Sequence, residues 1–280
     1  MSALSAIDLS YNSLTGTIAS AIGTATKLVS LFLHANDLGG TIPSSIGSMR
    51  SLTYLSLYSN SLRGTIPASI YALSALTNLE LGINSLTGTI DSAIGTATNL
   101  VSLILSSNLL GGTIPSSIGS MGSLTALALD NNSLRGTIPT TIVSMTNLIY
   151  FDLETNSLTG TIPDNIGRMS STLTFLFLED NQLTGTIPST FNQLNIMTFS
   201  FRTNYLTMGS LSTVPPSTFS AYTIYYMSDS GDELLNNCLA FAYGTVAVTA
   251  THCKPTAGKL IILYHINTRS RIVVCIAFYR

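Results

Sequence analysis

The hydrophobic residues of this chain recur at a fixed phase instead of in long runs. Around Asn60, leucine stands eight, five and three residues before the asparagine and two residues after it, and isoleucine stands six residues after it. The same pattern surrounds asparagines along most of the chain: Asn12, Asn36, Asn60, Asn84, Asn108, Asn132, Asn156, Asn181 and Asn204. Their spacing is 24 residues six times, then 25 and 23. This period predicts a solenoid in which each repeat forms one turn.

Each repeat contains a short segment with period-two alternation. The leucines five and three residues before an asparagine, such as Leu55 and Leu57, alternate with other residues, which predicts a strand with one buried face. Stacked turns place these strands in a parallel sheet. The asparagine stands where the chain turns inward, so we expect its side chain to bond backbone groups that a buried bend leaves unpaired. Glycines such as Gly64 permit the turn, and prolines such as Pro67 end the following strand.

Composition narrows the classes of function. Charged residues make up 9% of the 280 residues and the formal net charge is −2, so the chain lacks the basic surface that binds nucleic acid or an anionic membrane. The three histidines show no metal-ligand spacing, and the sequence has no phosphate-binding glycine loop and no nucleophile elbow. We therefore expect a non-enzymatic protein without metal or cofactor.

The N-terminus begins inside a repeat. Residues 1–7 show no signal peptide, and no polar cap of the kind that usually protects the end of a solenoid precedes Leu4. From this we expect that the natural N-terminus is incomplete. Membrane association is expected only if a missing terminus supplies an anchor.

The repeat pattern carries a resemblance to a known family. Leu-x-x-Leu-x-Leu-x-x-Asn-x-Leu-x-Gly-x-Ile-Pro resembles the leucine-rich repeat of the 24-residue plant-specific type, found in receptor-kinase ectodomains and polygalacturonase inhibitors, and it covers about residues 1–206. The resemblance implies an α/β-type solenoid: a right-handed coil of about nine repeats with a parallel β-sheet on its concave face. Residues 207–280 are then expected to form a small cysteine-containing cap or tail.

A narrower resemblance concerns the particular residues that fill the repeats. The monotonous Ser-Leu-Thr-Gly-Thr-Ile-Pro-Ser-Ser-Ile-Gly-Ser-Met segments, followed by a cysteine-bearing tail, are more similar to leucine-rich repeat surface antigens of kinetoplastid flagellates. Members of both groups are extracellular or cell-surface proteins that bind other molecules, usually through the concave sheet. The resemblance thus implies a surface recognition or adhesion protein.

An internal duplication indicates which face binds. Residues 15–86 and 87–158 align without gaps and differ at 24 of 72 positions. The positions six, four, two and one before each asparagine are expected to face the concave side, and 11 of these 12 differ, against 13 of the other 60. The variation predicts a concave binding face whose contacts differ between repeats. Drift on an unconstrained surface is the alternative.

Aromatic and acidic residues gather at these variable positions. Exposed aromatic side chains on a rigid sheet are typical of interface hot spots. We therefore predict a site for a protein or carbohydrate ligand made of these residues: Phe32, His34, Tyr54, Tyr58, Asp130, Tyr150, Asp152, Glu154, Phe175, Phe177, Glu179 and Arg202. The same carboxylates raise two alternatives, a calcium site and a glycosidase pair, but an open sheet offers neither converging loops nor a cleft.

Threonines form a second regular feature. Eight of them stand five residues after the asparagines and are expected to form a file at strand spacing: Thr17, Thr41, Thr65, Thr89, Thr113, Thr137, Thr161 and Thr186. Such files resemble ice-binding surfaces, so ice binding or a structural role is the alternative function. The neighbouring file is interrupted by Arg63 and Arg135. A strand preference for β-branched residues also explains the threonines. The N-glycosylation pattern at Asn131 lies on the concave side and is expected to be unused.

The periodic pattern fades after residue 206. A Ser/Thr/Pro-rich connector leads to Cys238 and Cys253, which flank an alternating segment at 245–249. We expect these two cysteines to form a disulfide that closes a cap in an oxidising compartment, with reduced core thiols as the alternative and Cys275 unpaired. The apolar runs 260–264 and 272–279 are too short to cross a bilayer and are expected to be strands.

Overall fold

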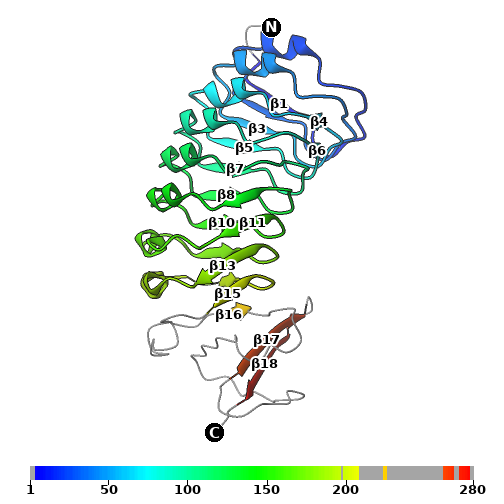
Figure 1. Cartoon of the computed structure of the whole chain (residues 1–280). Coiled ribbons are helices and arrows are strands. Elements are labelled where there is room, and N and C mark those ends of the chain that lie inside the picture. The colour runs from blue at the N-terminus through cyan, green and yellow to red at the C-terminus, as the bar shows by residue number, and fades with distance from the viewer. Residues whose placement is uncertain (1–3, 197, 208–222, 226–260, 268–270, 278–280) are drawn as a thin grey trace.

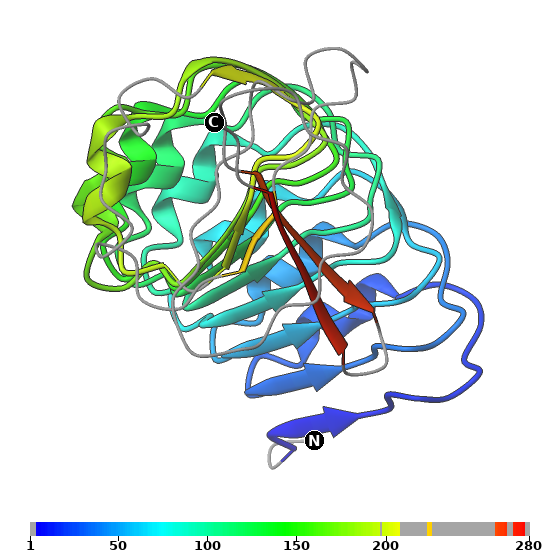
Figure 2. The same cartoon turned by 90° about the horizontal axis from the view of Figure 1, so that it is seen from below.

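The computed structural model describes residues 4–196, 198–207, 223–225, 261–267 and 271–277. The repeats stack as successive turns of one coil, with short helices along one side and a long sheet along the opposite side (Figure 1 and Figure 2). This is the solenoid with a parallel concave sheet that the 24-residue period predicts.

The concave sheet consists of ten parallel strands. Neighbouring strands pair in a register shifted by one repeat, so that Leu31 lies beside Leu55 and Leu55 beside Leu79. The last strand comes from beyond residue 206 and extends the sheet of the repeats by one strand. In spatial order the strands are β1 (Ala6–Asp8), β2 (Ser30–Phe32), β3 (Tyr54–Ser56), β5 (Asn78–Glu80), β7 (Ser102–Ile104), β8 (Ala126–Ala128), β10 (Tyr150–Asp152), β12 (Phe175–Phe177), β14 (Thr198–Ser200) and β16 (Thr223–Tyr225).

The core lies between this sheet and the convex side and is filled by the periodic leucines and isoleucines. Leu52, Leu55, Leu57 and Leu62 are all 0% exposed, and Ile66 is 5% exposed. Burial of a leucine side chain contributes about 1.5–3 kcal/mol. A single turn cannot shield both sides of its own leucines, so each turn depends on its neighbours for this contribution.

An asparagine ladder connects the turns at the exit from each strand. The Oδ1 atom of Asn60 accepts a hydrogen bond of 3.0 Å from the Leu38 N–H of the preceding turn, and its Nδ2 donates to the carbonyls of Leu33 and Leu57 at 3.0 and 3.1 Å. The same set of bonds recurs at every repeat asparagine from Asn36 to Asn204. The predicted role of the asparagine at the bend is confirmed.

The residue before each asparagine takes the left-handed conformation. In nine successive repeats this residue is not glycine and has a φ of 50° to 55°. The group includes the β-branched residues Ile83, Thr155 and Thr203, for which this conformation is costly. These residues turn the chain out of the strand, whereas the sequence pattern indicated only that they belong to the concave face.

The convex segments are 3-10 helices, and no α-helix occurs in the described residues. All except η7 begin after a residue with extended backbone, such as Pro43 before η2. Hydrogen bonds between residues three apart close each helix, as from the Ile46 N–H to the Pro43 carbonyl. Five residues are too few for a stable α-helix. The helices are η1 (Ser20–Thr24), η2 (Ser44–Ser48), η3 (Ala68–Ala72), η4 (Ser92–Thr96), η5 (Ser116–Ser120), η6 (Thr140–Ser144), η7 (Ile166–Met169) and η8 (Ser189–Gln193).

A second set of parallel strands follows the asparagine ladder. It comprises β4 (Arg63–Gly64) with β6 (Ser85–Leu86), and a four-stranded sheet of β9 (Arg135–Thr137), β11 (Ser157–Gly160), β13 (Gln182–Thr186) and β15 (Tyr205–Thr207). Its register is shifted by two residues relative to the repeat, so Thr17 pairs with Gly39 and not with Thr41. The eight threonines are therefore arranged obliquely, and the expected file at strand spacing is wrong.

The described part of the C-terminal region contains an antiparallel hairpin, β17 (Ile261–Asn267) and β18 (Arg271–Ala277). The two apolar runs are thus strands, as their length predicted. Cys238, Cys253 and the alternating segment at 245–249 lie outside the described residues, so their disulfide stays a prediction. In the ranges described, no helix is long and apolar enough to span a membrane.

Replacing Asn108 by alanine tests the ladder. The change removes the partner of the Leu86 N–H. The carbonyls of Leu81 and Leu105 each lose one of two donors and keep the Nδ2 groups of Asn84 and Asn132. We expect a loss of about 1–3 kcal/mol in the free energy of unfolding, set mainly by the orphaned N–H and measured by urea denaturation.

Asn12→Ala is the matched control, because Asn12 bonds only to carbonyls of its own turn, at Leu9 and Ser10. Its expected cost is below about 1 kcal/mol. Equal losses in the two variants would show that the bonds between turns do not stabilise the coil.

Candidate functional site

The concave face is built from side chains that alternate with the core leucines. Positions six, four and two before each asparagine point away from the core, as the period-two pattern predicts. At the middle position the burial depends on the residue: Ser56 is 1% exposed and Asp152 is 6% exposed, whereas Phe32 and Phe177 are partly exposed. Ligands therefore meet the outer two positions of each strand and, where the middle residue is large, the middle position as well.

The residues predicted near the N-terminus form one group, the aromatic surface, which consists of Phe32, His34, Tyr54 and Tyr58. The Phe32 ring lies 4.8 Å from that of Tyr54 and 6.1 Å from that of His34. The Tyr58 ring lies over Gly82, where a β-carbon would come within 3.0 Å of the ring atoms. In the sister repeat, where glutamate stands at position 154, the smaller aspartate replaces this tyrosine at position 130.

Two residues of this surface were missed by the sequence analysis. Tyr11, 80% exposed, packs edge-on against His34 at 5.1 Å between ring centroids. Glu80 accepts hydrogen bonds from the Tyr54 hydroxyl and, at 2.9 Å, from Ser56 Oγ. Tyr11 precedes the duplicated block, so the comparison of copies did not include it. The signal for Glu80 was present, since an acid also stands 72 residues later at Asp152.

The predicted residues nearer the C-terminus form a second group, the acidic surface: Asp130, Tyr150, Asp152, Glu154, Phe175, Phe177 and Glu179, with Arg202 at its edge. The Tyr150 ring lies 5.8 Å from that of Phe177 and 6.2 Å from that of Phe175. Its hydroxyl donates a 2.6 Å hydrogen bond to Asp152 Oδ2, and the Glu154 N–H donates to Asp152 Oδ1 at 3.0 Å. These bonds fix the buried carboxylate beneath the exposed ones.

The carboxyl groups of the acidic surface repel one another in a partly dry environment. Burial raises the pKa of Glu154 to about 8, assisted by its hydrogen bond to Glu179 and by the negative charges of Asp152, Glu179 and Asp130. Burial and the charge of Asp152 raise the pKa of Asp130 to about 6. Burial also raises the pKa of Glu179, although Arg202 acts in the opposite direction. Near neutral pH the surface therefore holds protons that a nearby cation would displace.

The two surfaces are separate. The rings of the aromatic surface lie on β2, β3 and the exits of β1 to β3, and its Glu80 lies on the neighbouring β5. The acidic surface lies on β8, β10, β12 and the exit of β14, and β7 separates β5 from β8. From β3 to β8 the distance across the sheet is about 14 Å, given the usual separation of strands. A ligand that reaches both surfaces must therefore be extended along the coil.

Neither surface is a metal site by its geometry. Within the described ranges, no group of three or more histidine, cysteine, aspartate or glutamate side chains is arranged to hold a metal ion. The carboxylates stand on an open sheet, so their lone pairs do not converge as a calcium site requires.

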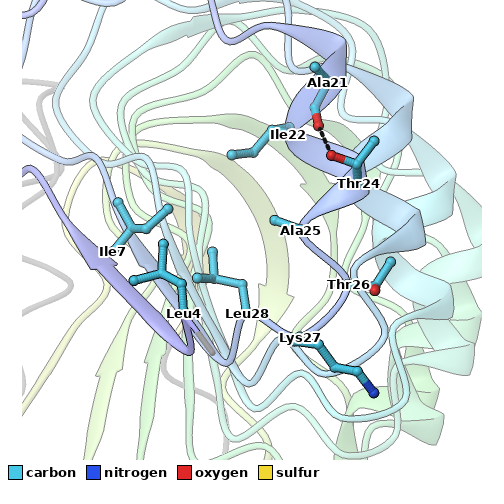
Figure 3. A pocket seen from close by; sticks show the side chains of 9 residues that line it. All are labelled: Leu4, Ile7, Ala21, Ile22, Thr24, Ala25, Thr26, Lys27 and Leu28. Carbon is cyan, nitrogen blue, oxygen red and sulfur yellow. Dashed lines mark hydrogen bonds between the residues drawn. The ribbon is translucent and has the colours of Figure 1, made fainter. Parts of the chain in front are cut away.

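A hollow of about 650 Å³ lies at the first turn of the coil (Figure 3). Its walls are core positions of the first two turns, including Leu4, Ile7, Ile22 and Leu28. Leu4 is 49% exposed, and Ile22 points toward it from η1. The hollow is the uncovered end of the hydrophobic core, and it contains no residue that the sequence singled out for function.

Comparison with known proteins supports the fold. Models of the leucine-rich repeat family match residues 122–183 and, in a shorter form, residues 3–25, 27–49, 51–73 and 99–121, together more than half of the chain. No curated protein matches the sequence significantly. The matching structures include many repeat proteins, so the resemblance of the repeat pattern is confirmed at the level of this family.

Three solved structures illustrate the similarity. The TDR receptor is 29% identical over 84% of this chain and 42% of its own, with a TM-score of 0.74. The ectodomain of the Arabidopsis receptor kinase HAESA, in complex with an IDA peptide hormone lengthened at its N-terminus, is 30% identical over 80% of this chain and 38% of its own (TM-score 0.71). A plant ice-binding protein is 26% identical over 78% of this chain and 80% of its own (TM-score 0.59). The chain thus spans about two-fifths of the receptor chains.

Glu154→Gln tests the electrostatics of the acidic surface. The pKa of Glu154 is raised on folding from 4.5 to about 8, so the folded state binds the proton more tightly and wild-type stability falls as pH rises through this range. Glutamine does not ionise. We expect the variant to raise Tm by about 2 °C or more at pH 9, and by much less at pH 5, in thermal unfolding experiments.

The matched control is Asp37→Asn, an exposed position outside the concave sheet. It should show no such gain at high pH. A Glu154→Gln variant with the same Tm difference at both pH values would contradict the repulsion described for this surface.

Proposed function

Because the chain belongs to the leucine-rich repeat proteins, we propose that it is a non-enzymatic recognition protein that binds a protein ligand on the concave face of its coil. The observation that carries the proposal is the acidic surface, where four carboxyl groups stand beside three partly exposed aromatic rings. Aromatic rings gain free energy when a partner covers them, and crowded carboxylates gain it when that partner supplies positive charge.

The chemistry of the acidic surface indicates a cationic segment of the ligand. An arginine or lysine placed near Glu154 and Glu179 relieves the repulsion that raises their pKa values, and the Tyr150, Phe175 and Phe177 rings supply faces for its alkyl stem or guanidinium group. A glycan lacks this positive charge. We therefore infer a peptide or protein ligand in preference to the carbohydrate alternative.

The structures of similar proteins support a peptide ligand. The HAESA ectodomain is seen with a peptide hormone, and RGFR1, described as a plant peptide hormone receptor and 31% identical over 80% of this chain, is seen with RGF2. Because this chain spans only about two-fifths of such receptors, its own ligand and any co-receptor are proposals. The separation of the aromatic and acidic surfaces fits an extended ligand that contacts both.

The site of action that follows is extracellular or at the cell surface, as for the receptor ectodomains that the chain resembles. Adhesion and the narrower resemblance to flagellate surface antigens stay predictions, because none of the matched structures described above is such an antigen. A membrane anchor is part of the proposal only if a segment beyond the given sequence supplies it.

A second candidate function is ice binding through the threonines of the second sheet. The observation that favours it is the similarity to the plant ice-binding protein, which covers 80% of that protein's length, whereas the receptors are covered to about two-fifths. The two candidate functions use different faces of the coil, and they can be tested independently.

A screen of the full chain against a peptide array and a glycan array tests the recognition proposal. We expect capture of peptides that contain arginine or lysine, and we expect Glu154→Lys to weaken their binding by at least about tenfold, because it replaces an attraction by a repulsion. Glu154 is half-buried and tolerates such a change better than Asp152, which is 6% exposed.

The control variant is Asp37→Lys, which makes the same charge change at an exposed position outside the concave sheet. It should bind the captured peptides as the wild type does. Equal weakening in both variants would indicate only a net-charge effect, and capture of glycans alone would overturn the choice of a protein ligand.

A further inference from the structure

The two-residue register shift of the second sheet produces an arrangement that the repeat alignment conceals. On β9, β11, β13 and β15, threonines of different repeat positions become direct neighbours. Thr137 pairs with Thr159, and Thr186 pairs with Thr207. The pairing of Gly160 with Leu183, continued by one residue, places Thr161 beside Thr184. We call the resulting group the threonine field: Thr137, Thr159, Thr161, Thr184, Thr186 and Thr207.

The threonine field is an oblique band of three threonine pairs that steps along the strands, two residues at a time. Its edges carry Gln182, which pairs with Thr159, and Tyr205, which pairs with Thr184. Neighbouring strands are separated by about 4.8 Å, and alternate residues such as Thr159 and Thr161 are about 6.6 Å apart along a strand. All six residues are exposed. Strands β11, β13 and β15, which carry most of the field, follow one another down the coil in Figure 1.

The backbone of the next turn holds these side chains in place. The methyl groups of Thr137 and Thr161 lie against Gly160 and Gly185, where a β-carbon would come within 2.8 Å of them. The Thr184 hydroxyl donates to the Gly160 carbonyl at 3.3 Å, and the Thr207 hydroxyl donates to the Gly185 carbonyl at 3.1 Å. Since threonine is restricted at χ1, such contacts hold the hydroxyl and methyl groups at defined positions.

The hydroxyls of the other members face solvent. In the described part of the chain, Thr137, Thr159, Thr161 and Thr186 have no protein hydrogen-bond partner for their hydroxyls. No charged residue lies within the field; Arg135 stands at its corner, where it pairs with Ser157. Elsewhere in the sheet Thr17 pairs with Gly39, Thr41 with Arg63, Thr89 with Gly111 and Thr113 with Arg135. The pairing of Gly64 with Leu86, continued by one residue, places Thr65 beside Thr87, but this pair stands alone and is flanked by glycine and arginine pairings.

We propose that the threonine field is an ice-binding surface, an inference that rests on the second candidate function and assigns it to six residues. Ice presents a lattice of water molecules that can both donate and accept hydrogen bonds. A protein surface that binds ice must hold hydroxyl groups at a regular spacing, with methyl groups between them. It must also lack charged groups, because these keep their own hydration shell. The field meets these requirements on four neighbouring strands, whereas the aligned file of eight threonines does not.

The test measures thermal hysteresis and inhibition of ice recrystallisation with the full chain. We expect both activities in the wild type and the loss of most of both in the double variant Thr161→Lys/Thr184→Lys, which places two bulky charges in the centre of the field. The matched control Thr17→Lys/Thr41→Lys changes two exposed threonines outside the field and should retain most of the activity. Thermal unfolding of each variant shows whether the coil is intact.

The possible failures are distinguishable. If the wild type shows neither activity, the ice-binding function and the assignment to the field both fall. If the wild type is active and the control variant loses as much activity as the field variant, only the assignment is overturned. The peptide screen and the ice assay concern different faces of the coil, so that a failed peptide screen and a failed ice assay are independent results.

Discussion

The structure depends on a single constraint: every turn of the coil must satisfy its buried backbone groups at the bend where the chain leaves the concave strand. The asparagine side chain meets this requirement by bonding its own turn and the preceding one at the same time. It can do so only at a fixed spacing, because Oδ1 must reach an N–H in the turn before. Because one asparagine in each turn fixes the distance to the turn before, the leucines of successive turns stack into one core and their strands pair in parallel.

A scaffold determined in this way leaves the outer concave positions free to vary. The residues at these positions determine the chemistry of the concave face. The acidic surface uses it to place Glu154 and Glu179 close enough to share a proton. Such an arrangement is unfavourable for the free protein at high pH, where it lowers the stability of the coil. Its physical use is to bind positive charge, which makes a ligand's affinity dependent on pH.

Much of the fold could be predicted from sequence because the leucines and asparagines act locally and periodically. The features that were not predicted arise from contacts between turns. The two-residue shift that pairs Thr17 with Gly39 depends on the slope of the second sheet, which no single repeat encodes. Burial of Asp152 depends on the rings and carboxyls of adjacent strands, and the contribution of Tyr11 depends on packing against His34. Of the site, residue types and faces were predictable, but depth and partners were not.

The central claim is that the acidic surface holds protons which a cationic ligand displaces. Isothermal titration calorimetry of the full chain with an arginine-containing peptide captured from the array measures this directly, when it is carried out at pH 7 in two buffers of different ionisation enthalpy. The pKa of about 8 at Glu154 predicts that binding releases protons, and therefore that the observed enthalpy differs between the buffers. Binding with the same enthalpy in both buffers would contradict the account.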